Sequence, residues 1–314
     1  MRRYHIVLNP KSGAALAIGL TAEKLAASFA ANGLEATMDA DDSVPFAERI
    51  ERAKNADAEV IVSAGGDGTA TALANALADT GKALAVLPLG TANLLARDLS
   101  LPLDLEATIA ALGTMETRQI DVGEVNGRVF LHKVVVGLIP SIAAGREHIR
   151  GRQTLPALLG FGGYFLRRLT RARRIALEIT SADTTDRVER VQAIAVANNA
   201  YDQGLGRVFS RTALDTGQLT LYVLRHLTLG DVLRLSAEML AGRWQADDAL
   251  GIESVGSVRI RMKRPSVKVM IDGEVEMFSS PLDFRIRPKA LTVLAPVAAV
   301  VTDPADGELI AVTG

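Results

Sequence analysis

The sequence predicts two domains, an N-terminal doubly wound α/β domain and a mainly antiparallel β domain. Up to about residue 115, short apolar runs alternate with helical patterns, as in a parallel sheet with helices on both faces. From about residue 118, runs of strand length follow one another with few helical patterns between them. A length of 314 residues also exceeds that of a typical single domain. The predicted boundaries are 1–117, 118–290 and a tail, 291–314, that could return to the first domain.

The elements of the first domain follow from apolar runs and from the residues that start and stop helices. Gly33 stops the first helix, Ser43 is a candidate cap for the second, and Asp104 caps the last. Strands are predicted over Tyr4–Leu8, Leu34–Met38, Val60–Ala64 and Ala83–Leu87. Helices are predicted over Ala15–Asn32, Pro45–Asn55, Thr69–Ala78 and from Asp104 to about Leu112.

The second domain begins with a strong turn signal. Asn126-Gly127 predicts a two-residue hairpin between strands over Arg118–Val125 and Arg128–Val136. Further strands are predicted over Ile175–Ser181, Val188–Ala197, Leu219–Leu224, Ser257–Met262, Val267–Ile271, Leu282–Ile286 and Leu291–Ala295. Helical stretches are predicted over Leu155–Arg171 and Gly230–Ala241.

Composition excludes several classes of function. The formal net charge is −1, from 35 basic and 36 acidic side chains, which argues against a general nucleic-acid binder. The chain has no cysteine, so disulfides, thiolate nucleophiles and cysteine metal sites are impossible. The histidines are scattered without metal-ligand spacing: His5, His132, His148 and His226. The apolar runs are too short for a signal peptide or a membrane span, so we expect a cytoplasmic protein with at most peripheral membrane contact.

Three glycine-containing loops each follow a predicted strand of the first domain. They are Asn9-Pro10-Lys11-Ser12-Gly13, Gly65-Gly66-Asp67-Gly68-Thr69 and Pro88-Leu89-Gly90-Thr91-Ala92-Asn93. Because the carboxyl ends of parallel strands lie at one edge of the sheet, where ligands bind, the loops are expected to converge. No P-loop spacing and no Gly-x-Gly-x-x-Gly motif occurs.

The chemistry of these loops fits phosphate. Glycines let backbone N–H groups approach oxygens closely, and the helices that follow add partial positive charge. Lys11 supplies a full positive charge, and Thr69 and Thr91 supply hydroxyls. Asp67 is unexpected among phosphate-binding amides, and it makes sense if it holds Mg²⁺ or assists deprotonation of an acceptor hydroxyl.

In sequence order, these motifs resemble the diacylglycerol kinase catalytic-domain family, which includes sphingosine kinases and soluble bacterial lipid kinases. The resemblance extends from Asn9 to about Ala295. Besides the three loops it includes Asp121-Val-Gly-x-Val-Asn126-Gly, Asn198-Asn199 followed by Gly204 and Gly206, and Asp272-Gly273-Glu274.

The resemblance implies a C-terminal β-sandwich, an active site in the cleft between the domains, and transfer of the γ-phosphoryl of ATP to a lipid hydroxyl with Mg²⁺. Either Asp272 or Glu274 would be the base, although Asp-Gly alone is a hairpin signal. Catalytic roles are therefore expected for Asp272, Glu274 and Asp67. The expected nucleotide-binding residues are Asn9, Pro10, Lys11, Ser12, Gly13, Gly65, Gly66, Asp67, Gly68, Thr69, Ala70, Thr71, Gly90, Thr91 and Asn93.

The chain departs from the family pattern at two places. Thr71 and Ala72 stand where members often have Asn and Glu. Thr216 stands where bacterial members carry an Asp of a structural Mg²⁺ site, and Asp215 is a substitute ligand one residue earlier. Two rivals stay open. NAD kinases, which act on a soluble acceptor, use a similar Gly-Gly-Asp-Gly loop, and the departures at Thr71, Ala72 and Thr216 are compatible with a non-catalytic nucleotide- or lipid-binding module.

The stretch 160–174 combines aromatic residues with arginines, among them Phe161, Tyr164, Arg167 and Arg168. Such a surface suits anionic headgroups on the inner face of a membrane, and an ordinary amphipathic helix explains it equally well. The expected partners are ATP and a lipid, with no nucleic acid. A homodimer is compatible with the sequence, which does not identify the lipid.

Overall fold

The computed structural model describes most of the chain outside a few segments. The described residues are 2–137, 174–181, 185–202, 210–225 and 250–297, with scattered residues of 228–241 and of 300–311. The predicted helix over 155–171 and nearly all of the stretch 160–174 lie outside the described residues, as do Gly204 and Gly206. Of the predicted helix Gly230–Ala241, only scattered residues are described.

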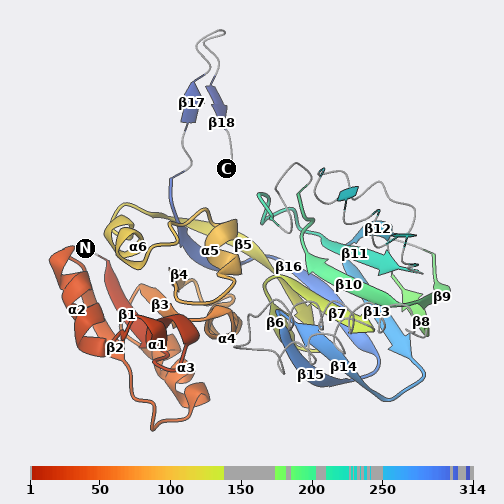
Figure 1. Ribbon diagram of the computed structural model, residues 1–314, viewed down its shortest axis with the longest axis horizontal. Coiled ribbons are helices and arrows are strands. Elements are labelled where there is room, and N and C mark those ends of the chain that lie inside the picture. Colours follow the sequence, from red (N-terminus) through yellow and green to blue (C-terminus); the bar gives the residue numbers. More distant parts are fainter. Residues whose placement is uncertain are drawn as a thin grey trace. The chain divides into compact units, whose positions relative to one another are not determined.

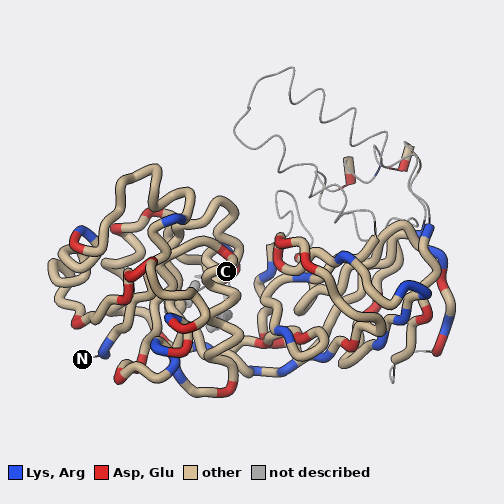
Figure 2. Tube along the Cα trace, turned by 90° about the horizontal axis from the view of Figure 1, so that it is seen from below, with Lys and Arg blue, Asp and Glu red and all other residues tan. Residues whose placement is uncertain are grey.

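Two compact units make up the chain (Figure 1). The first comprises Met1–Val122, Thr212–Asp215 and Pro288–Gly314, and the second comprises Gly123–Arg211 and Thr216–Arg287. The first unit is an α/β fold and the second is a β-sandwich, so the predicted fold class is confirmed. Acidic and basic residues are interspersed along both units (Figure 2).

The first unit is built on a parallel sheet. Its strand order is β2 (Glu35–Asp39), β1 (Arg3–Leu8), β3 (Val60–Gly65) and β4 (Ala83–Pro88). Every residue of β3 and β4 is buried, as expected for strands covered on both faces. The four strands predicted for this region are confirmed.

Helices in two groups pack on this sheet. Helix α2 (Ala22–Ala31) packs against β2 and α6 (Leu105–Ala111). Helix α3 (Phe46–Asn55) packs against β1 and α4 (Asp67–Leu77) (Figure 1). Asp104 caps α6 as predicted, because its carboxylate accepts a hydrogen bond of 2.8 Å from the Ala107 N–H.

Three predictions for this unit were wrong in detail. The predicted single helix over Ala15–Asn32 is divided into α1 (Gly13–Ala17) and α2, because Gly19 adopts a φ of 56° and Thr21 caps α2. Ser43 does not cap α3, since its N–H and hydroxyl both donate to Asp41. Helix α5 (Leu94–Asp98) was not predicted, because five residues carry too little periodicity.

The second unit packs two sheets around one apolar core. One antiparallel sheet has the order β12 (Leu250–Val255), β11 (Leu219–Leu224), β10 (Ala193–Asn198), β7 (Lys133–Gly137), β14 (Ser266–Ile271) and β15 (Glu274–Ser279). The other contains β5 (Glu116–Val125), β6 (Arg128–Phe130), β8 (Ile175–Thr180), β9 (Arg187–Val191), β13 (Ser257–Met262) and the start of β16 (Leu282–Ala295). Phe130, Ile194 and Phe284 are among the buried core residues.

Several strand boundaries in this unit differ from the prediction. The predicted strand Val188–Ala197 is divided between β9 and β10, which belong to different sheets. The strand predicted over Arg128–Val136 is divided into β6 and β7. In both cases the chain passes from one sheet to the other within a segment of strand-like residues, and the sequence there has no Gly, Pro or Asn turn signal.

Strand β16 was predicted as two strands with a domain boundary between them. It is one strand that pairs antiparallel with β13 at its start and parallel with β4 near its end. Beyond it, β17 (Val300–Thr302) and β18 (Leu309–Ala311) pair with each other. None of the described helices is long and apolar enough to cross a membrane.

Candidate functional site

The three glycine-containing loops meet at the carboxyl edge of the parallel sheet. Asn9 follows β1, and its side-chain amide donates to the Thr69 hydroxyl at 3.4 Å. Gly66 follows β3 and faces Gly90, which follows β4, because a Cβ atom on Gly66 would lie 3.7 Å from the Gly90 Cα. The first loop therefore contacts the second, and the second contacts the third.

Asp67 fastens the second loop to the third. One carboxylate oxygen accepts from the Asn93 N–H at 3.2 Å, and the other accepts from the Leu94 N–H at 2.7 Å. These N–H groups lie at the start of α5 and have no acceptor within that helix. The carboxylate that looked out of place among phosphate-binding amides thus has a structural partner in the protein itself.

Asn93 shapes the third loop. It adopts a φ of 50°, in the left-handed region that Asn tolerates better than most residues. Its side-chain oxygen accepts from the Gly90 N–H at 2.7 Å, and its amide donates to the Pro88 carbonyl at 3.4 Å. A Cβ atom on Gly90 would lie 2.9 Å from the Asn93 side-chain oxygen and 3.0 Å from an Asp67 carboxylate oxygen. Glycine is therefore required at position 90 by close packing.

The first loop contains an unsatisfied polar atom. The Ser12 hydroxyl is buried and has no hydrogen-bond partner among the described residues. An unsatisfied buried hydroxyl usually marks a water, ion or ligand partner. Together with the closely packed glycines, this hydroxyl fits a ligand rich in oxygen acceptors, such as the phosphates of a nucleotide.

The other predicted nucleotide-binding residues differ in exposure. Gly13, Gly68 and Thr91 are exposed at the loops. Ala70 and Thr71 are buried in α4. Pro10 is half-buried beside Asn9. Gly65 leaves space for Thr69, because a Cβ atom at position 65 would lie 2.5 Å from the Thr69 hydroxyl oxygen.

An acidic loop that sequence reasoning missed lies beside the first glycine loop. Lys11, predicted to meet phosphate, forms an exposed ion pair of 3.1 Å with Asp42. Asp42 belongs to the β2–α3 connection together with Asp41, and Asp39 is the last residue of β2. The signal in the sequence was the acidic run Asp39-Ala-Asp41-Asp42 at the carboxyl end of a strand at the same sheet edge.

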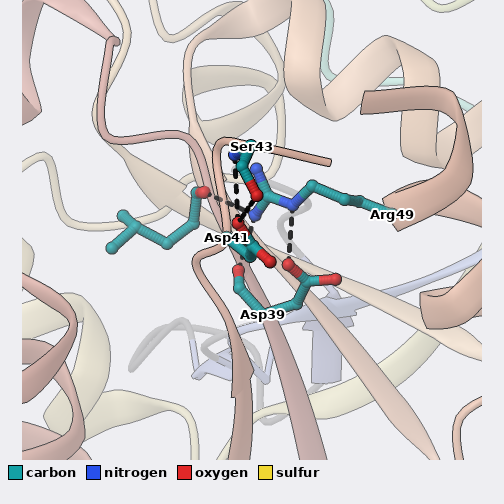
Figure 3. A network of polar contacts seen from close by, with 5 residues as sticks. Asp39, Asp41, Ser43 and Arg49 are labelled. Atoms are coloured by element: carbon teal, nitrogen blue, oxygen red, sulfur yellow. Dashed lines mark hydrogen bonds and ion pairs between the residues drawn. The ribbon is translucent and has the colours of Figure 1, made fainter. Parts of the chain in front are cut away.

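Arg49 of α3 holds the ends of β1 and β2 together (Figure 3). Its guanidinium is buried, and it donates to the Asp39 carboxylate at 2.6 Å and to the Leu8 carbonyl at 2.7 Å. Leu8 is the last residue of β1 and precedes Asn9. Arg49 therefore fixes the backbone from which the first glycine loop departs.

Asp272, a predicted catalytic residue, lies in the turn between β14 and β15. It adopts a φ of 47°, with Gly273 at 98°, which confirms the two-residue hairpin turn. Its carboxylate accepts three backbone hydrogen bonds of 2.7, 2.9 and 3.0 Å from the N–H groups of Leu131, His132 and Lys133. Glu274 is exposed and begins β15, directly after the turn.

A buried polar cluster surrounds the Asn198-Asn199 pair. Arg211 is 2% exposed and donates to the carbonyls of Leu131 and Asn198 at 2.8 and 2.6 Å. Its guanidinium also contacts a ring nitrogen of His132 at 2.6 Å. Sequence reasoning missed Arg211 and His132, because neither belongs to a motif and only the fold brings them together.

Comparisons with known proteins agree with this organisation. Residues 3–125 match the family described as diacylglycerol kinase catalytic domain, and residues 141–295 match the family described as YegS C-terminal NAD kinase beta sandwich-like domain. A Pseudomonas aeruginosa protein named "Probable lipid kinase YegS-like" is 32% identical, over 79% of this chain and 80% of its own. The chain belongs to the diacylglycerol kinase catalytic-domain family. The resemblance stated from the motifs is thereby confirmed.

A further relative and two solved structures are also similar to this chain. A diacylglycerol kinase of Bacillus subtilis is 26% identical, over 87% of this chain and 90% of its own. The crystal structure of a diacylglycerol kinase from Bacillus anthracis aligns with a TM-score of 0.66 at 19% identity, over 95% of this chain and 98% of that one. An NAD kinase from Archaeoglobus fulgidus, solved with ATP, has a TM-score of 0.51 at 13% identity.

Asp215 and Thr216, which stand where the family resemblance implied a structural Mg²⁺ site, both contact protein groups. Asp215, the substitute ligand, lies 3.6 Å from the Arg118 guanidinium. Thr216 donates its N–H and hydroxyl to the Asn199 side-chain oxygen. Among the described residues, no group of three His, Asp or Glu side chains could hold a metal ion. The residues at this place therefore form hydrogen bonds and an ion pair with protein groups.

Proposed function

We propose that this protein is an ATP-dependent lipid kinase that transfers the γ-phosphoryl group of Mg-ATP to a hydroxyl of a diacylglycerol-like lipid. The observation that carries the proposal is the direct contact among three glycine-containing loops at one sheet edge, in a member of a lipid kinase family. In phosphoryl transfer, most of the catalysis comes from positioning and charge neutralisation. A site made of closely packed backbone amides suits that task.

In the proposal, the nucleotide lies against the loops at Asn9–Gly13, Gly65–Thr71 and Gly90–Asn93. The Ser12 hydroxyl would gain a partner, and the N-terminus of α4 would face phosphate oxygens. Lys11 would exchange its exposed ion pair with Asp42 for a phosphate, at little cost because exposed ion pairs contribute about 0–1 kcal/mol.

Asp67 would be the protein's contribution to magnesium binding. Mg²⁺ in kinase sites is commonly held by one or two carboxylates together with substrate phosphates and water. Each Asp67 oxygen accepts one N–H bond and keeps a second lone pair, so the residue fits a single-carboxylate site. The ion would neutralise negative charge that develops on the transferring phosphoryl group.

The acceptor hydroxyl would be oriented by the second unit. Its oxygen attacks the γ-phosphorus, the bond from that phosphorus to the bridging oxygen of ADP breaks, and the hydroxyl proton passes to a carboxylate. We assign that carboxylate to Asp272, because its three N–H bonds hold it in one orientation, and we treat Glu274 as the alternative. Transfer requires that the nucleotide and the acceptor meet during turnover.

Radiolabelled ATP and a total lipid extract test the proposal, with the product identified by mass spectrometry. A phosphorylated lipid should form with the wild-type protein and be lost in Asp67→Ala. Asp272→Asn should abolish transfer while Glu274→Gln retains it, and the opposite pattern would assign the base to Glu274. Formation of NADP from NAD without lipid product would support the NAD kinase alternative, and ATP binding without any turnover would support a binding module.

Membrane contact is the second part of the proposal. The segment 160–174 is proposed to touch anionic headgroups on the inner face of the membrane, on the strength of its aromatic and basic composition. Co-sedimentation with anionic vesicles should weaken in Arg167→Glu/Arg168→Glu. Unchanged binding of this variant would remove that part and leave the kinase proposal standing.

A further inference from the structure

Strand β1 extends beyond its neighbour β2 at the edge of the sheet where the glycine loops lie. The last paired residues of the two strands are Val7 and Asp39. Backbone groups along a strand face its two neighbours alternately, and the Asn9 N–H bonds to the Ala64 carbonyl of β3 at 2.9 Å. The Leu8 carbonyl therefore faces the side of β2, beyond the last backbone pair.

Arg49 of α3 binds this carbonyl (Figure 3). One nitrogen of its buried guanidinium donates to the Leu8 carbonyl at 2.7 Å and to the Asp39 carbonyl at 2.6 Å. Another nitrogen donates to the Asp39 carboxylate at 2.6 Å. The rigid guanidinium thus joins the ends of β1 and β2 at the point where their backbone pairing stops.

A buried ion pair such as Arg49 and Asp39 is weak evidence for a purely stabilising role. Taking two charges out of water costs about as much as their attraction returns, so apolar residues of similar volume often stabilise a fold equally well. What a guanidinium adds is geometry, because its N–H groups bind acceptors in fixed directions. Here one of those acceptors belongs to Leu8, the residue directly before the first glycine loop.

Asn9, the next residue, anchors the first loop. Its side-chain oxygen accepts from the Lys11 N–H at 3.2 Å, and its carbonyl accepts from the Ser12 N–H at 3.1 Å. Its side-chain amide donates to the Thr69 hydroxyl of the second loop at 3.4 Å. A displacement of the Leu8 carbonyl would therefore move the residue on which the loop and its contact with the second loop depend.

An exposed ion pair joins the same two connections a second time. Lys11 of the first loop lies 3.1 Å from Asp42 of the β2–α3 connection. In the proposed function, Lys11 exchanges this carboxylate for a phosphate, so the exposed contact is lost when ATP binds. The buried contact at Arg49 involves no residue of the loop itself and can persist in the complex.

We propose that Arg49 is a positioning residue of the nucleotide site. By binding the Leu8 carbonyl, it holds the first glycine loop in the conformation that receives ATP, and Asp39 holds Arg49. The inference rests on the proposed function, since ATP is its ligand. It deepens that function by assigning control of ATP affinity to a side chain that is buried beneath the loops.

A purely structural role and a positioning role of Arg49 predict different behaviour. If the ion pair only stabilises the fold, ATP affinity should follow stability in every variant. If Arg49 positions the loop, ATP affinity should follow its bond to Leu8. Asp39→Asn keeps the guanidinium and its bonds to both backbone carbonyls. Arg49→Lys keeps the charge, but an ammonium has no planar fork with which to reach both strand ends.

The experiment measures the Kd for ATP by calorimetry, and stability in urea, for wild type and four variants. Asp39→Leu/Arg49→Met replaces the ion pair by apolar side chains, so it should retain most of the stability that Arg49→Met alone loses. This double variant and Arg49→Lys should both raise the Kd for ATP by about 10- to 100-fold, the range for a lost hydrogen bond to a charged group. Asp39→Asn, and the control Arg52→Lys at an exposed position of α3, should stay within about threefold of wild type.

Amide hydrogen exchange gives a second readout that needs no ATP. The N–H groups of Lys11 and Ser12 both bond to Asn9, so they should exchange faster in Arg49→Lys and at the wild-type rate in Asp39→Asn. Unchanged exchange in Arg49→Lys would contradict the positioning role.

The binding data separate failure of this inference from failure of the proposed function. Equal loss of ATP affinity in Asp39→Asn and Arg49→Lys, or wild-type affinity in the double variant, would overturn the inference. If the affinities follow the expected pattern but no lipid is phosphorylated, the inference stands and only the kinase proposal fails. If lipid is phosphorylated and Arg49→Lys raises the KM for the acceptor instead of that for ATP, the inference fails and the kinase proposal stands.

Discussion

The substitution Asp67→Asn tests whether the carboxylate joins the glycine loops. Asp67 accepts one hydrogen bond on each oxygen, from the N–H groups of Asn93 and Leu94. Asparagine has the same shape but only one acceptor oxygen, so it can keep one of the two bonds. Its NH₂ group would face the other N–H, and two donors would meet without an acceptor.

The two hydrogen bonds of Asp67 determine the free energy that the substitution is expected to cost. A hydrogen bond to a charged group contributes about 1.5–3 kcal/mol, and leaving a donor unsatisfied costs a similar amount. We expect Asp67→Asn to destabilise the joined arrangement of the loops by about 2–3 kcal/mol, a factor of about 30 to 150 in its equilibrium. If the nucleotide binds only the joined arrangement, the Kd for ATP should rise by up to that factor.

Amide hydrogen exchange at Asn93 and Leu94 reports the bonds directly, and calorimetry reports ATP affinity. Asp104→Asn is the matched control, because Asp104 accepts a single bond from Ala107 in an exposed cap and Asn caps helices as well as Asp does. Its stability and ATP affinity should therefore match wild type.

Unchanged amide protection at both positions in Asp67→Asn would refute the structural role. Lost protection with unchanged ATP affinity would show that the loops need not be joined for binding. If Asp67 acted solely on magnesium, the protein without ligand would be as stable as wild type, and ATP affinity would fall only with the metal present. The structural role and the magnesium-binding role of Asp67 therefore predict different results.

Gly90→Ala should weaken ATP binding by about tenfold or more, because its Cβ would lie 2.9 Å from the nearest side-chain atom, whereas Gly113→Ala, with 3.7 Å of space, should bind ATP normally. Arg49→Met should lower the free energy of unfolding by about 3–5 kcal/mol in urea, since it leaves a buried carboxylate unpaired and the Leu8 carbonyl without its donor. Because the pKa of Lys133 is lowered from 10.5 to about 8 on folding, the unfolded chain binds more protons between these values, so stability should rise with pH across that window. Lys133→Met should lack this rise and be more stable below pH 8 by roughly 3 kcal/mol, and a rise that persists in the variant would contradict the assignment.

Short sequence patterns correctly predicted a helix cap, a turn and the strands of the first unit, each of which depends on a few neighbouring residues. Asp104 capped its helix, Asn126-Gly127 formed its turn, and the strands of the first unit lay where apolar runs ended at polar loops. The convergence of the glycine loops followed from the direction of parallel strands alone. Such features need no knowledge of distant contacts.

Long-range packing determined the strand boundaries that local sequence patterns did not predict. The β9 and β10 strands separate because the chain changes sheets at Gln192, whose N–H is bonded to the Leu224 carbonyl at 2.8 Å. The segment there contains no Gly, Pro or Asn that would mark a turn between two strands. Likewise, β16 continues across the boundary predicted between residues 290 and 291, pairing with β13 before it and with β4 after it.

The sequence by itself determined the fold class, the three loops and the family, because motif residues and apolar periodicity are local properties of the chain. The tertiary structure alone decided what the charged residues do. Asp67 binds backbone amides of the next loop, and Asp272 binds amides about 140 residues away along the chain. Electrostatic interactions depend on distance and burial in space, and neither is a property of sequence spacing.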